Sequence, residues 1–372
     1  PWLTLKLMQF VASYDKSIPL NYGIFKDITV SVPKGSLLNP VFPAAVGIRS
    51  AAAIRIGDVL TGCLAIAAPN LIPAPSGGTV VPTVLAEYDA ALGTRRVQVM
   101  QSLVGGTGAR LGADGVDGRD TSLANCFNTP TEASEAEVGA VVLHYGLRSG
   151  SGGPGKWRGG TGLIFTMRID NHGSAVLGRG LERYVFRPFG LMGGRPGTPA
   201  RVVQNLGRED EYELGKISMV EPKPGDAVTL MSAGGGGYGD PFERPKEAVL
   251  RDVRAGFVNV DEARTDYGVV IENGNINFRA TETLRTQDRP SPAPFEFGPE
   301  REAWDRVFTD TRMLVLTDYL LSKPPALATR LRAQLFSDLL PDLGQMPLDE
   351  LLTDPETLGQ RLDDMIAKIA NS

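Results

Sequence analysis

The residues best suited to chemistry lie in one polar stretch, residues 114–137, which is rich in aspartate, asparagine and glutamate. A glycine-rich run, residues 105–110, precedes it. Carboxylates and carboxamides gathered in a loop region can bind a polar substrate or support the ligands of a metal ion. The same residue types also form Asx turns on a protein surface and cap a helix, here one expected from about Thr131. The residues alone leave these two interpretations equally open.

Two glycine clusters have features of nucleotide-binding loops. The first, residues 150–157, nearly fits the pattern GxxxxGK[ST], but Trp157 replaces the hydroxyl group that would bind Mg²⁺. No helix start follows it, although phosphate binding requires one. Both this cluster and residues 234–239 contain GxGxxG, but Asp240 and Pro241 interrupt the strand-to-helix transition of a Rossmann fold. We therefore expect no cofactor-binding residues here and assign both clusters to turns and close backbone packing.

Histidine and cysteine are too few and too scattered for the common metal motifs. The chain has two histidines, His144 and His172, and two cysteines, Cys63 and Cys126. They form no HxH, HxxH, HExxH or CxxC pattern, and no serine lies in a GxSxG elbow. We therefore expect no complete metal site from this chain alone and no Ser-His-Asp triad. The two cysteines form no disulfide framework and fit a reducing cytoplasm.

Length, net charge and the distribution of apolar residues indicate which classes of protein the chain does not fit. The 372 residues suffice for two domains or one large one, and the net charge of −5 argues against a nucleic-acid partner. The apolar stretch at residues 59–74 is interrupted by Pro69 and Pro73 and is shorter than the about 18 apolar residues of a membrane span. We expect a cytoplasmic protein without a membrane segment. Because the chain begins without Met, either an initiator was removed or this is a piece of a longer polypeptide.

The elements that must position these residues change along the chain. The 44 glycines and 27 prolines predict many turns and irregular loops. Residues 28–32 alternate as a strand does, and residues 44–68 form an alanine-rich helical pattern. Between residues 100 and 240, β-like runs lie between glycine clusters, which indicates an antiparallel β region. Helical patterns follow, one of them with Asn259 as a plausible cap.

We therefore predict an α+β protein with a β-rich body, Gly-rich loops and a helical C-terminal tail. The body would span residues 1–287, a Pro-rich linker residues 288–298, and the tail residues 299–372. In the tail, apolar residues that include Trp304, Phe308 and Leu314 recur at helical spacing. We expect this stripe to dock on the body or on another subunit, because a lone amphipathic helix is marginal in water.

Four segments in a fixed order are more specific than any single glycine cluster. The first comprises residues 18–23, 35–40 and 42–45; the second is 105–135; the third is 147–162; and the fourth is 233–241, leading to 252–256 and 267–270. The centre of the second reads Asn-Cys-Phe-Asn-Thr-Pro-Thr-Glu, residues 125–132. Together they resemble the hydantoinase B/5-oxoprolinase family, over the C-terminal two-thirds of a B-type subunit.

The resemblance implies both a reaction and partners. Such subunits act with an A-type subunit that uses ATP and Mg²⁺, and hydrolyse cyclic amides such as hydantoins and 5-oxoproline. Related complexes carboxylate acetone or acetophenone. ATP phosphorylates the amide or enol oxygen, and the B-type subunit houses the later chemistry, often beside a metal. Typical members carry a longer N-terminal half with His- and Asp-containing metal motifs that nothing here matches. A divalent metal would therefore be bound mainly by upstream residues, and no metal ligand is assigned to this chain.

The resemblance favours one function and leaves alternatives open. We expect this chain to be part of the B-type component of an ATP-dependent cyclic-amide hydrolase, in a hetero-oligomer with the A-type subunit and the missing N-terminal half, and inactive alone. The alternatives are part of a ketone carboxylase, or a non-catalytic scaffold subunit. Five residues of the polar stretch are the candidates for lining the site. They are Asp120, Asn125, Asn128, Glu132 and Glu135.

Overall fold

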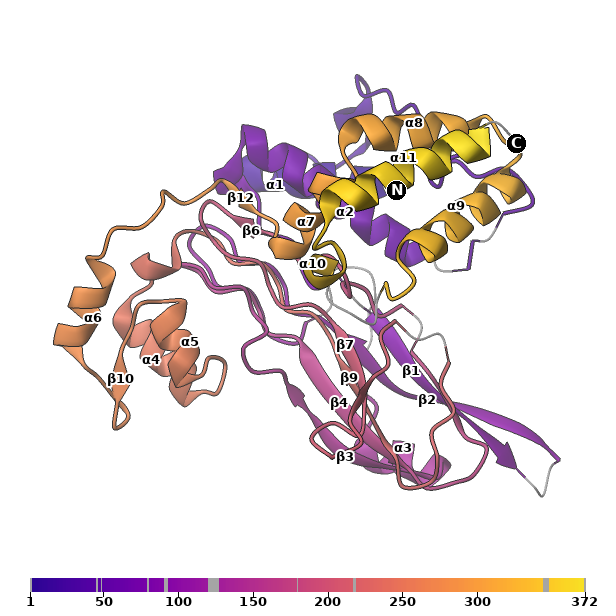
Figure 1. Ribbon diagram of the computed structural model, residues 1–372. Coiled ribbons are helices and arrows are strands. Elements are labelled where there is room, and N and C mark those ends of the chain that lie inside the picture. The colour runs from indigo at the N-terminus through magenta and orange to yellow at the C-terminus, as the bar shows by residue number, and fades with distance from the viewer. Residues whose placement is uncertain are drawn as a thin grey trace. The chain divides into compact units, whose positions relative to one another are not determined.

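The computed structural model describes residues 2–44, 46–47, 49–78, 80–89, 93–119, 127–178, 180–216, 219–343 and 348–370. The chain divides into two compact units: residues 3–52 together with 299–372, and residues 53–298. The predicted α+β class is confirmed, because antiparallel sheets and helices both make up the chain (Figure 1).

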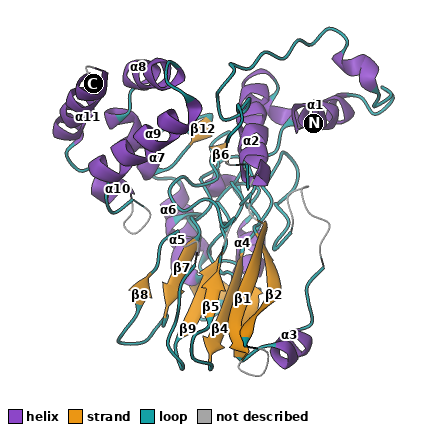
Figure 2. Ribbon diagram, turned by 90° about the vertical axis from the view of Figure 1, so that its right-hand side faces the viewer, coloured by secondary structure: helices purple, strands orange, loops and turns teal. Residues whose placement is uncertain are grey.

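The larger unit contains a β-sandwich (Figure 2). One sheet has the order β2 (Thr94–Val104), β1 (Val80–Asp89), β5 (Ala175–Leu177). The other has the order β3 (Ala140–Leu147), β4 (Leu163–Ile169), β9 (Ala227–Met231), β7 (Arg201–Gln204), β8 (Tyr212–Glu213). All neighbours are antiparallel. Alternate residues of β4 are buried, and they share one core with Leu85, Met100 and Leu103 of the other sheet. The inner faces of the two sheets therefore form a single hydrophobic interior.

A helical lobe follows the last long strand. It contains η3 (Pro241–Glu243), α4 (Lys246–Arg254), α5 (Val260–Thr265), the hairpin β10 (Ile271–Glu272) and β11 (Asn275–Ile276), and α6 (Phe278–Arg285). Asn259 caps α5 as predicted, and Glu262 completes a capping box. The buried Tyr267 packs with Val249 and Val258, so the lobe has a small core of its own.

Extended glycine-rich segments pack backbone to backbone beside the sandwich. We call residues 74–78, 105–118, 151–162, 188–197 and 233–239 the glycine-loop core. Its segments are joined laterally: Gly153 N donates to Gly235 O at 2.8 Å, and Gly235 N donates to Gly160 O at 2.8 Å. A Cβ atom on Gly235 would lie 2.0 Å from the carbonyl oxygen of Thr107. The segments can approach this closely only because glycine has no side chain. Near their ends, β6 (Gly190–Leu191) pairs with β12 (Phe295–Glu296).

The smaller unit is helical. Its first part contains α1 (Trp2–Tyr14), η1 (Tyr22–Phe25) and the start of α2 (Arg49–Ala67), which continues into the larger unit and is followed there by η2 (Pro69–Leu71). Residues 28–32 form no strand, contrary to the prediction. Its second part contains α7 (Pro299–Val307), α8 (Asp310–Leu321), α9 (Pro325–Leu339), α10 (Leu348–Leu351) and α11 (Pro355–Ala370).

The apolar stripe of the tail packs within the tail itself. Trp304 stacks on Phe308 at 3.8 Å between ring centroids, and both rings lie against Phe336 of α9. Val307 and Phe308 are buried, whereas Leu314 is 63% exposed. The tail helices therefore bury most of the stripe against one another, whereas Leu314 stays exposed to solvent.

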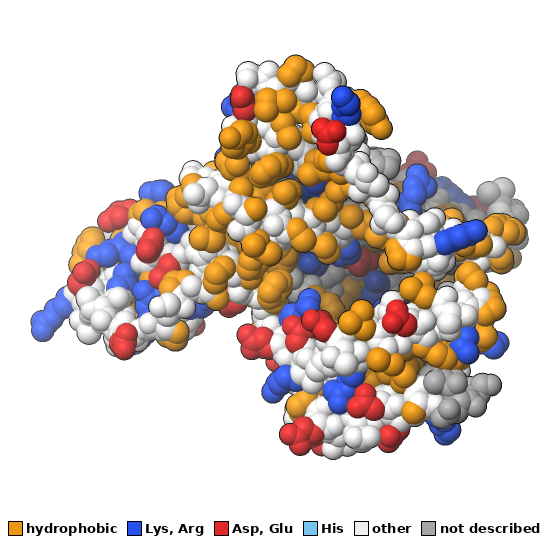
Figure 3. Space-filling view, turned by 90° about the horizontal axis from the view of Figure 1, so that it is seen from above, with side chains coloured by type: hydrophobic (Ala, Val, Ile, Leu, Met, Phe, Trp, Pro, Cys, Tyr) orange, Lys and Arg blue, Asp and Glu red, His pale blue; other side chains and the backbone are white. Residues whose placement is uncertain are grey.

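Hydrophobic side chains are exposed along much of residues 14–66, and Figure 3 shows how widely such side chains cover the face seen from above. Within the described residues, α2 is long and apolar enough to cross a membrane, by length and composition alone. The apolar stretch that we considered in the sequence, residues 59–74, starts later and includes two prolines that α2 does not contain. One such helix is weak evidence for a span, because core helices of other proteins meet the same criteria.

Candidate functional site

The structure places three of the five predicted site residues near β3; Asp120 and Asn125 lie outside the described residues. Asn128 is exposed, and its Oδ1 accepts a hydrogen bond from the Tyr145 hydroxyl at 3.0 Å. Glu132 is exposed in the first turn of α3 (Thr131–Glu137). Glu135 Oε1 accepts a hydrogen bond from the backbone N–H of Val142 at 2.6 Å.

Contacts with the first sheet fix the C-terminal side of this loop. Gln101 Nε2 donates to the carbonyl of Thr129, and the buried Ser134 donates from Oγ to the carbonyl of Met100 at 3.1 Å. The helix starts at Thr131 as predicted, but its N-cap is Pro130, which makes no side-chain cap. Ser134 therefore ties α3 to β2.

Tyr145 holds Asn128 from the sheet. Its ring meets Phe165 edge to face at 5.7 Å between centroids, which anchors it on the core. Burial raises the pKa of Tyr145, so its hydroxyl stays protonated at neutral pH and donates. With Oδ1 occupied in this way, the Nδ2 group of Asn128 donates to none of the described residues and can donate to a bound molecule.

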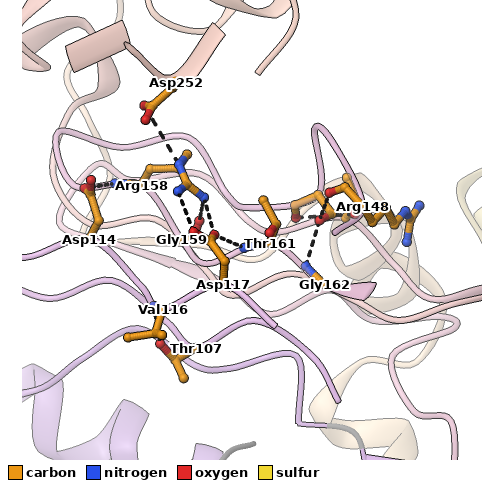
Figure 4. A network of polar contacts seen from close by, with 12 residues as sticks. Thr107, Asp114, Val116, Asp117, Arg148, Arg158, Gly159, Thr161, Gly162 and Asp252 are labelled. Atoms are coloured by element: carbon orange, nitrogen blue, oxygen red, sulfur yellow. Dashed lines mark hydrogen bonds and ion pairs between the residues drawn. The ribbon is translucent and has the colours of Figure 1, made fainter. Parts of the chain in front are cut away.

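A buried ionic network fixes the N-terminal side of the polar stretch. Asp114 Oδ1 accepts from the backbone N–H of Arg158 at 2.7 Å and from Arg244 Nη1 at 2.7 Å. Asp117 Oδ1 accepts from Arg158 Nη1 at 2.9 Å and from the N–H of Thr161 at 2.7 Å (Figure 4). The loop that leads to the candidate residues is thus pinned to the glycine-loop core at two carboxylates.

Arg244 joins this loop to the helical lobe. Its guanidinium binds both oxygens of Asp114, the carbonyl of Lys156 and, from Nε and Nη2, the carboxylate of Asp252 on α4. Burial opposes ionisation of Asp114, but the hydrogen bond and charge of Arg244 outweigh burial, so the pKa of Asp114 is lowered. Arg244 donates four hydrogen bonds from its three nitrogens in a planar fork, which a lysine could not do.

At the polar stretch and in the glycine clusters, the described residues do not fit a metal ion or the phosphate groups of a nucleotide. No group of three or more His, Cys, Asp or Glu among them could hold a metal. The carboxylates of Asp114, Asp117 and Asp252 face arginine guanidinium groups, which supply the positive charge that a cation would bring. In the glycine clusters, the N–H groups of Gly153, Gly160 and others donate to backbone carbonyls rather than into an open cradle.

Sequence reasoning missed Tyr145, Arg158 and Arg244. Arg244 is 130 residues from Asp114, and Tyr145 lies on a strand 17 residues from Asn128. One signal was available: Asp114 and Asp117 each precede or follow glycine in a repeated Asp-Gly pattern, which is typical of a tightly folded loop that needs a buried partner. No residue near Arg244 in the sequence indicates that its side chain binds Asp114.

The comparisons with known proteins agree with this architecture. A family model described as hydantoinase B/oxoprolinase matches residues 4–241. The B-type subunit of a putative D-/L-hydantoinase from Pseudomonas sp. strain NS671 is 31% identical over 289 residues, which are 76% of this chain and 48% of that protein. The beta subunit of the caprolactamase from Pseudomonas jessenii is 30% identical over 279 residues, which are 72% of this chain and 48% of that protein.

Two solved structures are also similar. The ATP-dependent caprolactamase of Pseudomonas jessenii has a TM-score of 0.63 at 26% identity, over 76% of this chain and 50% of that one. An acetone carboxylase has a TM-score of 0.60 over 98% of this chain and 50% of that one; at 17% identity this likeness shows the fold alone. The chain spans about half the length of the curated relatives named above. The family match covers more than half of the chain, and the chain therefore belongs to the hydantoinase B/oxoprolinase family.

Proposed function

We propose that this chain is part of the B-type component of an ATP-dependent hydrolase of cyclic amides. One observation carries the proposal: over about three quarters of its length the chain is at least 30% identical to B-type or beta subunits that are named for a hydantoinase and a caprolactamase. The substrates in both names are cyclic amides. A solved structure similar to this chain is of an ATP-dependent caprolactamase, which supports ATP as the energy source.

The active assembly contains more polypeptide than this chain. An A-type subunit supplies the ATP and Mg²⁺ site, and the remaining half of the B-type subunit supplies the ligands of any divalent metal. Two findings support this arrangement: the chain spans about half of its relatives, and side chains such as Leu37 and Phe42 are exposed by 81% and 94%. Such residues are expected at interfaces with further polypeptide. The chain alone is inactive, and the assembly is cytoplasmic.

Asn128 is the residue we place at the reacting group. Water attacks the carbon of the phosphorylated amide, the C=N electron pair moves to the nitrogen, and the C–N bond breaks as the nitrogen takes a proton. A second water then hydrolyses the resulting acyl phosphate with release of phosphate, and negative charge develops on its carbonyl oxygen during this attack. Asn128, held by Tyr145, donates from Nδ2 to that oxygen. Glu132 contacts the substrate from the first turn of α3, and Asp120 and Asn125, which lie outside the described residues, stay candidates for lining the site. Glu135 acts as a positioning residue, since its carboxylate is already engaged by the backbone of β3.

Turnover of the assembled complex tests the reaction class. The chain, its remaining B-type half and the A-type subunit are purified together, and ADP release is measured with hydantoin, 5-oxoproline, caprolactam and acetophenone, each with and without bicarbonate. We expect ADP release with a cyclic amide that needs no bicarbonate. ADP release only with acetophenone and bicarbonate would assign the chain to a ketone carboxylase instead. No substrate-dependent ADP release would favour a scaffold role.

Replacing Asn128 tests the site. In the same complex, Asn128→Ala should lower turnover by about 100-fold or more, because one oxyanion donor is worth about that much, with the melting temperature nearly unchanged. Asn70→Ala is the matched control: Asn70 is also exposed and also accepts from a tyrosine hydroxyl, that of Tyr238 at 3.4 Å. Full activity of the Asn128 variant would show that Asn128 has a structural role and does not take part in catalysis.

A further inference from the structure

A second pair of arginines, away from the candidate site, shares a single carboxylate. Arg183 Nη2 lies 2.6 Å from Asp58 Oδ2, and Arg55 Nη1 lies 3.3 Å from the same oxygen. The side chains of Arg183 and Asp58 are 8% and 15% exposed, and that of Arg55 is 30% exposed. Two guanidinium groups thus face one negative charge. Glu182 also attracts Arg183, but its Oε1 lies 3.3 Å from Lys216 Nζ.

Several N–H groups of this pair lack an acceptor. Arg55 Nη2 donates to the carbonyl of Gly78 at 3.2 Å, and Arg183 Nη2 donates to the carbonyl of Ser76 at 3.2 Å. Arg55 Nε, Arg55 Nη1 and Arg183 Nε are buried and have no hydrogen-bond partner among the described residues. Buried donors of this kind are rare, and each requires an explanation such as a bound ion or water.

The backbone beside the two arginines adopts conformations that residues with a side chain rarely adopt. Arg183 has φ of 71°, in the left-handed region that residues with a side chain rarely adopt. Gly78 has φ of 61°, and a Cβ atom there would lie 1.8 Å from Arg55 Nη2. Burial lowers the pKa of Arg183 to about 10; Asp58 opposes this and the charge of Arg55 adds to it. Strained conformations that persist are concentrated at ligand sites.

We propose that Arg55 and Arg183 form a binding site for a small oxyanion, a carboxylate or a phosphate. The anion accepts from the three nitrogens that lack a hydrogen bond, one of which, Arg55 Nη1, also faces Asp58 at 3.3 Å, and it supplies a second negative charge. Water would satisfy at most two of these donors and would bring no charge. The Arg55 side chain is 30% exposed, but its Nε and Nη1 are buried, so the anion reaches them when this side chain shifts. The site does not depend on the proposed hydrolase function, because it follows from the charges and donors alone.

Thermal unfolding of the full chain tests the site. Inorganic phosphate is titrated at constant ionic strength, with sodium chloride as the balance, and sodium acetate replaces phosphate in a second series to distinguish the two oxyanions. We expect a saturable rise in melting temperature of about 3 °C or more with at least one of them. Arg183→Gln and Arg55→Gln should each abolish the rise. Arg55 is the less buried of the two, so its variant tests the site even if the Arg183 variant fails to fold.

Arg195→Gln is the matched control. Arg195 is 37% exposed and pairs one to one with Asp266 at 2.7 Å, so its loss should leave the rise intact. An equal rise in wild type and in all variants would mean that the anions act by exclusion from the protein surface. That result, or no rise with either anion, would overturn the proposal and leave water as the occupant.

Discussion

Two arginine pairs lie in the larger unit, and their positive charges are neutralised differently. Arg158 and Arg244 face the carboxylates of Asp114, Asp117 and Asp252, and among the described residues only Arg158 Nε, 3.9 Å from Asp252, lacks a hydrogen bond. Arg55 and Arg183 face Asp58 and leave three nitrogens without a hydrogen bond to any described residue. Burial alone therefore does not tell a structural arginine from a ligand-binding one. The two kinds of arginine differ in how many negative charges and hydrogen-bond acceptors surround the guanidinium group.

The largest effect should come from breaking the neutralised pair. Arg244→Met leaves the buried Asp252 and the partly exposed Asp114 without their main partner, which should lower the free energy of unfolding by about 3–5 kcal/mol. Urea unfolding measures it. Arg168→Met is the control, because Arg168 and Asp170 are both 40% exposed and such pairs contribute about 0–1 kcal/mol. Similar losses in the two variants would show that the Arg244 network is not structural.

A smaller loss is expected in the glycine-loop core, to which both pairs are attached. Gly235→Ala places a Cβ atom 2.0 Å from the Thr107 carbonyl oxygen, and overpacking of this kind costs about 1–3 kcal/mol or more. Gly62→Ala is the control: its Cβ would meet Phe189 at an ordinary 3.6 Å inside helix α2, where alanine stabilises by about 0.5–1 kcal/mol. Urea unfolding measures both variants. Equal stability of the two would mean that the glycine-loop core is loosely packed.

A still smaller effect is expected in the free energy of unfolding at acid pH when Asp114 is replaced. Arg244 keeps the folded-state pKa of Asp114 below its usual value, although burial opposes this. The carboxylate therefore adds stability above its unfolded pKa of about 3.9, and this stability is lost as the pH falls through the lower folded value. Asp114→Asn should flatten the loss of stability below about pH 4. The exposed Asp305, paired with Arg301, serves as control in Asp305→Asn, which should leave the slope nearly unchanged.

Much of the fold could be predicted from local pattern. β4 (Leu163–Ile169) buries alternate residues and β9 (Ala227–Met231) buries all of its residues, and both lie in the region 100–240 where the sequence predicts antiparallel strands. The cap at Asn259 was readable because capping depends on residues three apart. Residues 28–32 show the limit of local pattern: they alternate like a strand but pair with no neighbour among the described residues, because a strand needs a partner as well as a propensity.

The candidate site was only partly predictable. The loop and the start of α3 followed from polar composition and from Pro130, whereas the partners of its residues did not. Tyr145 reaches Asn128 through the placement of β3, and Arg183 reaches Asp58 across 125 residues. Such pairings are set by the packing of the sheets and glycine segments. No single stretch of sequence records them.

Removing one carboxylate from each pair compares them most directly. Phosphate binding to the full chain is measured by calorimetry for wild type, Asp58→Asn and Asp114→Asn. Loss of Asp58 leaves Arg55 and Arg183 without the carboxylate they share, so Asp58→Asn should bind phosphate about tenfold more tightly than wild type, equivalent to about 1.4 kcal/mol. Asp114→Asn should bind as wild type does, because Asp117 and Asp252 still face its arginines. Equal or weaker binding by Asp58→Asn would contradict the distinction between the two pairs.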